Sequence, residues 1–72
     1  MTATSEEVLR SACWFAGAIY GGVQEASRGR RWLVVTDPET RSTGMIPLDA
    51  AFTTSRVVVK VQEIRRRWKE MT

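Results

Sequence analysis

The stretch SACWFAGAIYGGV, residues Ser11 to Val23, decides how the rest of the chain can fold. From Ala12 to Tyr20 it carries no charge, although 26% of the chain is charged. A helix that is apolar nearly all the way round has to be covered on several sides. A chain of 72 residues has little material for that purpose.

We expect this stretch to lie in a helix from about Ser5 to Tyr20, which extends at most to Ala26 and has Gly21-Gly22 as its stop signal. Spacings of four and three predict a core-facing stripe made of Val8, Ala12, Phe15, Ile19 and Val23. The opposite side predicts an exposed apolar interface, with Trp14, Ala18 and Tyr20 as its candidate residues. Such a surface would serve a homodimer or a tight complex with another protein.

A β-hairpin is predicted next. Arg31 to Thr36, RWLVVT, is rich in strand-forming residues, and Asp37-Pro38-Glu39-Thr40 has the composition of a type I turn. Arg41 to Leu48 is the returning strand. Its Gly44 and Pro47 disfavour a central position, so we place this strand at the edge of the sheet.

The last segment supports two interpretations. Apolar residues recur at helical spacing over its whole length, at Val57, Val61, Ile64, Trp68 and Met71. We therefore predict a basic amphipathic helix from about Ser55 to Met71. The alternative is a third antiparallel strand over Arg56 to Gln62, which the run of valines favours.

These segments predict a single α+β domain over residues 1–72, in the order α-β-β-α. The formal net charge is +3, and the positive charge is concentrated in two short stretches. A basic cluster suits an anionic partner surface. The candidate residues for binding a partner or a nucleic acid are Arg28, Arg30, Arg31, Trp32, Arg65, Arg66, Arg67 and Lys69.

The residue types needed for catalysis are scarce. The chain has no histidine, which is the commonest general base and metal ligand, and Cys13 is its one cysteine. We find no phosphate-binding glycine motif. The sequence therefore predicts no enzymatic activity, no cofactor and no metal site. The lone cysteine indicates a reducing, cytoplasmic setting, and the Ala12 to Val23 run is too short to span a membrane.

Two functions agree with these features. The first is a non-enzymatic protein-binding regulator or inhibitor, directed at a nucleic-acid-handling enzyme or complex. Mobile-element proteins such as anti-CRISPR inhibitors share this size and lack of motifs, which is a likeness of style and not of sequence. The alternative is a small basic DNA- or RNA-binding protein that uses the arginine clusters.

Overall fold

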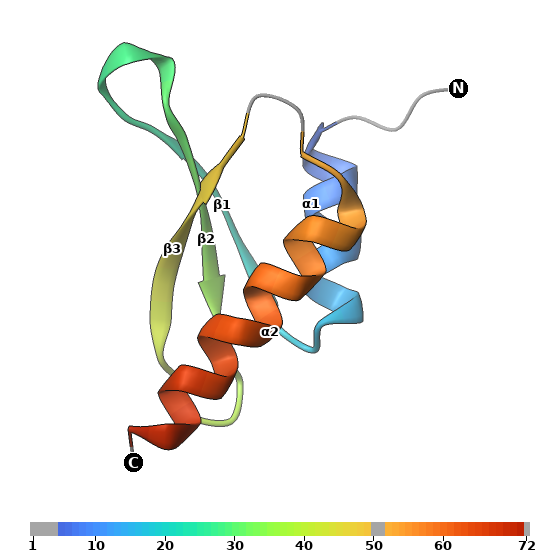
Figure 1. The fold of residues 1–72 in the computed structure, drawn as a ribbon, viewed down its shortest axis with the longest axis vertical. Helices are drawn as coiled ribbons and strands as arrows, with labels where there is room; N and C mark the ends of the chain where they lie inside the picture. Colours follow the sequence, from blue (N-terminus) through green and yellow to red (C-terminus); the bar gives the residue numbers. More distant parts are fainter. Residues whose placement is uncertain (1–4, 50–51, 72) are drawn as a thin grey trace.

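The computed structural model describes residues 5–49 and 52–71, which form two helices and a three-stranded antiparallel sheet (Figure 1). The α+β class is confirmed. The elements are α1 (Ser5–Phe15), β1 (Ile19–Glu25), the 3-10 turn η1 (Ser27–Gly29), β2 (Arg31–Thr36), β3 (Thr43–Leu48) and α2 (Thr54–Glu70).

The first helix is shorter than predicted, because Gly17 ends it. Gly17 has a φ of 74°, in the left-handed region that glycine adopts without strain. Its N–H donates to the Trp14 carbonyl at 3.0 Å, and the Ala18 N–H donates to the Cys13 carbonyl at 2.9 Å. These two bonds form a Schellman motif, which satisfies the last carbonyls of the helix. The stop signal is therefore Gly17, and not Gly21-Gly22.

The residues predicted to end that helix form strand β1 instead. β1 pairs antiparallel with β2, and the register shifts between Tyr20 and Val23. A Cβ at Gly21 would lie 2.9 Å from Cγ1 of Val34, so a glycine is needed where β1 approaches β2. A two-stranded hairpin is marginal alone, and β1 supplies the third strand that it needs.

The predicted hairpin is confirmed, with β2 in the centre of the sheet and β3 at its edge. Pro47 lies opposite Trp32, and Gly44 lies opposite Val35. The edge position explains why β3 tolerates Pro47, since an edge strand has one side without ladder bonds.

The C-terminal helix is also confirmed, and the alternative strand over Arg56 to Gln62 is wrong. α2 begins after Thr53, whose side chain accepts a hydrogen bond from the Arg56 N–H at 3.3 Å. Val57 and Val61 lie one turn apart on this helix, and both are buried. Helical periodicity therefore outweighed the β propensity of single valines.

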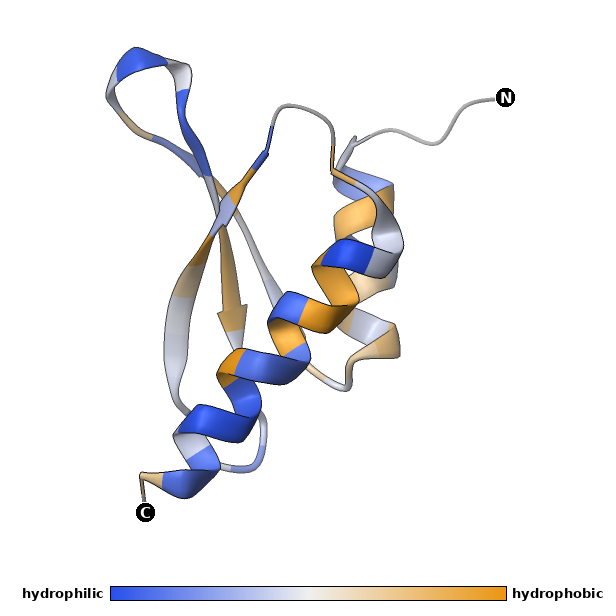
Figure 2. Ribbon diagram, in the orientation of Figure 1, coloured by the Kyte–Doolittle hydropathy of each residue, from blue (hydrophilic) through white to orange (hydrophobic). Residues whose placement is uncertain are grey.

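The two helices pack against each other and against one face of the sheet, as Figure 1 shows. Figure 2 shows hydrophobic residues along β2 and on several turns of α2. The buried hydrophobic residues are Leu9, Ala12, Cys13, Ala16, Leu33, Val35, Ile46, Val57 and Val61. This core leaves the other face of the sheet without a helix.

Candidate interaction surfaces

Arg65 is a predicted binding residue that the structure places largely inside the protein. Only 15% of its side chain is exposed. Its Nη1 donates to the Ala16 carbonyl at 2.6 Å, at the C-terminal end of α1, where a cation complements the helix dipole. Its Nε lies 3.3 Å from Oδ2 of Asp37. Arg65 therefore joins α2 to the end of α1 and to the turn after β2.

Asp37 is the one buried charged or polar residue of the described core, with no exposed surface. Burial alone would raise the pKa of its carboxyl. The Glu39 N–H donates to Oδ1 at 2.8 Å, and Nη2 of Arg65 donates to the same oxygen at 3.4 Å. These hydrogen bonds and the arginine charge outweigh burial, so the pKa of Asp37 lies below its ordinary value.

Acid should therefore weaken the fold through Asp37. A carboxylate whose pKa is lower in the folded state stabilises the fold above its ordinary pKa of 3.8, and this contribution is lost as the pH falls through the folded-state value. We expect the unfolding midpoint of the wild type to drop steeply below about pH 4. The unfolding midpoint of Asp37→Asn should be lower than that of the wild type above about pH 4, and it should change less as the pH falls. Circular dichroism melts across this pH range measure the effect, and parallel curves would contradict it.

The C-terminal basic stretch is divided among different environments. Arg66 and Arg67 are exposed on α2. Nζ of Lys69 lies 3.2 Å from Oε2 of Glu39, in the turn after β2. Because the Arg65 side chain is largely buried, the four basic residues Arg65, Arg66, Arg67 and Lys69 do not form one basic surface.

The basic loop is divided as well. Arg28 and Arg30 are exposed near the tip of the β1–β2 connection. Arg31 lies on the helix side of the sheet, with its guanidinium 5.9 Å from the ring centroid of Phe52. Trp32 is next along β2 and lies on the opposite side. Figure 1 shows this loop at one end of the molecule and the C-terminal end of α2 at the other, so the two arginine clusters make no common site.

Two aromatic side chains project from the end of α1. Trp14 is 76% exposed and Phe15 is 67% exposed. Their ring centroids lie 5.4 Å apart at an interplanar angle of 76°, an edge-to-face pair. Arg10 and Ser11 line the same surface.

The predicted apolar interface is thus altered. Trp14 is exposed as expected, but Ala18 and Tyr20 are half-buried against the core, with the Arg10 guanidinium 5.0 Å from the Tyr20 ring centroid. The predicted core positions of Phe15, of Ile19, which is 52% exposed, and of Val23, which is 37% exposed, were wrong. The buried stripe is Leu9, Ala12, Cys13 and Ala16. This stripe also has helical spacing, and its small residues were the signal that could have found it.

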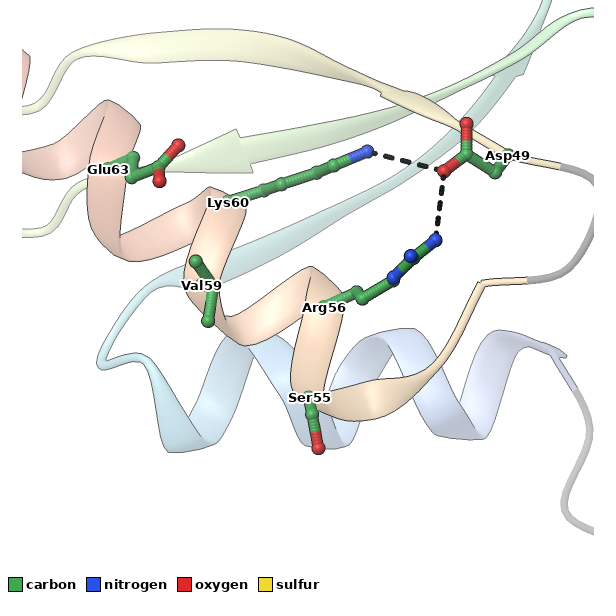
Figure 3. Close-up of a pocket in the computed structure, with 6 residues that line it drawn as sticks. All are labelled: Asp49, Ser55, Arg56, Val59, Lys60 and Glu63. Carbon is green, nitrogen blue, oxygen red and sulfur yellow. Dashed lines mark ion pairs between the residues drawn. The ribbon is translucent and has the colours of Figure 1, made fainter.

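A shallow groove between the end of β3 and α2 contains the residues drawn in Figure 3. Arg56 and Lys60 point toward Asp49, at 3.8 and 3.7 Å from its Oδ2, whereas Ser55 points away (Figure 3). Arg56 and Asp49 are well exposed and Lys60 is partly exposed, so these long ion pairs contribute little to stability. The two ion pairs link the end of β3 to α2, and none of the residues that line the groove is an activated nucleophile.

The described residues offer no reactive thiol, metal site or membrane-spanning helix. Cys13 is fully buried, and burial raises the pKa of its thiol to about 11. Within residues 5–49 and 52–71, no group of His, Cys, Asp and Glu side chains is arranged to hold a metal ion. In the same ranges, no helix has the length and apolar character required to cross a membrane.

Comparison of the chain with protein-family models, curated proteins and solved structures finds no match.

Proposed function

We propose that this protein is a non-enzymatic protein-binding regulator or inhibitor that docks through Trp14 and Phe15. The observation that carries the proposal is the exposure of these two rings side by side at the end of a short helix. Tryptophan is among the residue types that supply most of the binding energy at protein interfaces. Water contact with two large aromatic surfaces is unfavourable, and a partner would remove it.

The surroundings of the pair fit a docking surface with an apolar centre and a polar rim. Arg10, one helical turn before Trp14, is held in place by Glu6, with Nη2 and Oε1 2.8 Å apart. The Schellman motif at Gly17 fixes the end of the helix just after Phe15. The pair is therefore presented on a rigid element, which lowers the entropic cost of binding.

The partner would be a protein with an apolar pocket. We favour a nucleic-acid-handling enzyme or complex, because the chain also exposes arginines such as Arg28, Arg30, Arg66 and Arg67. Their separation over the molecule argues against the alternative of a single nucleic-acid site that combines the loop arginines with those of α2 (Figure 1). No catalytic role is needed, since binding alone can block or position a partner.

The test compares three baits in affinity capture: the wild type, the Trp14→Ala/Phe15→Ala variant and the control Met71→Ala. Met71 is 81% exposed at the end of α2, so its truncation removes a similarly exposed apolar side chain elsewhere. The dissociation constant of each captured protein is then measured by calorimetry. We expect the Trp14→Ala/Phe15→Ala variant to bind at least about 30-fold more weakly than the wild type, the size of a hot-spot effect of about 2 kcal/mol, and Met71→Ala to bind as the wild type does.

A second copy of the chain is the other occupant that this surface could take. Sedimentation equilibrium of the wild type and the double variant measures it directly. Self-association that depends on Trp14 and Phe15 would identify a homodimer. A protein that stays monomeric and captures nothing in a Trp14- and Phe15-dependent way would contradict the proposal.

A further inference from the structure

The face of the sheet turned away from the helices is covered by no other element of the described chain (Figure 1). Strand alternation and pairing define this outer face. Its residues are Ile19, Gly21 and Gln24 of β1, Trp32, Val34 and Thr36 of β2, and Thr43, Met45 and Pro47 of β3. Ile19 and Met45 are about half exposed, at 52% and 51%. The outer face is therefore apolar in its middle, and its aromatic residue is Trp32, whose side chain is partly exposed.

Within residues 5–49 and 52–71, no carboxylate side chain lies on the outer face. Asp37 and Glu39 are turned toward Arg65, and Asp49 toward Arg56 and Lys60 on α2. Glu25 pairs in register with Arg31, on the side of the helices. The other acidic residues of the chain are Glu6 and Glu7 on α1 and Glu63 and Glu70 on α2.

Arginines lie at both ends of the outer face. Arg30 is extended and immediately precedes β2, so it falls on the same side as Trp32, with Arg28 beyond it. Arg41 is exposed in the turn between β2 and β3. Within the described ranges these three arginines form no ion pair. The face thus combines one aromatic side chain, close to the β1–β2 loop, with arginines that form no ion pair in the described part of the chain.

We propose that the outer face binds single-stranded nucleic acid, with a base stacked on Trp32 and phosphates on Arg30 and Arg41. Proteins that bind single strands combine aromatic platforms with a positively charged track for the backbone. The six residues of β2 span about 20 Å, which is the length of about six stacked nucleotides at about 3.4 Å each. The phosphate backbone of a single strand carries negative charge along its whole length, so one strand can meet arginines at both ends of a face to which the described residues contribute no negative charge.

The experiment is a fluorescence-anisotropy titration with labelled oligo(dT) and oligo(U) of about twelve nucleotides, and with a duplex of equal length, at about 50 and about 150 mM salt. Single strands should bind more tightly than the duplex, whose bases are not free to stack. Trp32→Leu, which keeps an apolar side chain, should weaken binding by about 5- to 100-fold, the effect of losing one stacked base. Trp32→Phe should retain most of the affinity.

Two matched controls separate this site from general charge attraction. Arg30→Ala/Arg41→Ala and Arg66→Ala/Arg67→Ala each remove two positive charges, but the second pair lies on α2. The first variant should lower the salt slope of log K by about 1.4, or 0.7 for each phosphate contact, and the second should change it much less. Equal effects of both variants, or an unchanged affinity in Trp32→Leu, would overturn the proposal.

Trp14→Ala distinguishes this inference from the proposed function. Trp14 lies on α1, away from the outer face, so its truncation should leave nucleic-acid affinity unchanged while it weakens protein binding. Unfolding midpoints of all variants show that each is folded at the assay temperature. A wild type that binds neither oligonucleotide at about 150 mM salt would also overturn the inference, and it would leave the test of Trp14 and Phe15 unaffected.

Discussion

Replacement of Arg65 by alanine should lower the midpoint of thermal unfolding by more than about 10 °C, the largest effect that we expect from one substitution. The change leaves the Asp37 carboxylate buried without its cation. It also removes the 2.6 Å hydrogen bond to the Ala16 carbonyl, so the end of α1 loses a partner. Removal of one member of a buried ion pair is strongly destabilising, because the other charge stays desolvated.

The double variant Arg65→Met/Asp37→Asn tests this cause. It removes both charges and should recover part of the loss, as expected when no uncompensated charge remains buried. Arg66→Ala is the matched control, because Arg66 is exposed on the next position of α2 and should change the midpoint by less than about 4 °C. Similar losses at Arg65 and Arg66 would show that the interior contacts of Arg65 are unimportant.

The second large effect is expected at Gly44, on the helix-facing side of β3. A Cβ at this position would lie 2.8 Å from Cζ2 of Trp68 and 3.2 Å from Cδ1 of Ile64. Both side chains pack against the core, so Gly44→Val would force them away from the sheet. We expect a loss of about 2 kcal/mol, a typical cost of overpacking, which is large for a small domain. Chemical denaturation measures it.

A double-mutant cycle with Trp68→Leu checks the steric origin of that loss. Leucine lacks the ring that meets the new side chain, so Gly44→Val should cost less in the Trp68→Leu background than in the wild type. An equal cost in both backgrounds would assign the effect to the strand itself and not to the contact with Trp68.

The elements that could be predicted are those whose signals come from residues close together in the sequence. α2 and the β2–β3 hairpin were found because their periodicity, turn residues and breakers are all local signals. β1 was missed because Gly21 and Gly22 weaken any local preference, and its strand conformation depends on pairing with β2. Arg65 was assigned to a basic surface because its partners, Asp37 and the Ala16 carbonyl, lie far from it in the chain.

The candidate binding surfaces also differ in whether local sequence or contacts between distant segments decide them. Trp14 could be placed outside the core from the sequence, whereas Phe15 could not, since which side of α1 is buried depends on where α2 and β1 lie. The loop arginines were visible as a cluster, but strand alternation sends Arg31 to the helix side and Trp32 to the outer face.

The amino-acid sequence by itself determined the α+β class, the basic C-terminal helix, the hairpin with its edge strand and the lack of histidine. The tertiary structure alone decided that Gly17 ends the first helix, that residues 19–25 form a strand, and that Arg65 belongs to the interior. It also placed the carboxylate side chains of the described residues off the outer face of the sheet. The physical reason is that helical periodicity and turn propensity act over a few residues, whereas strand pairing, burial and charge pairing depend on which distant segments meet.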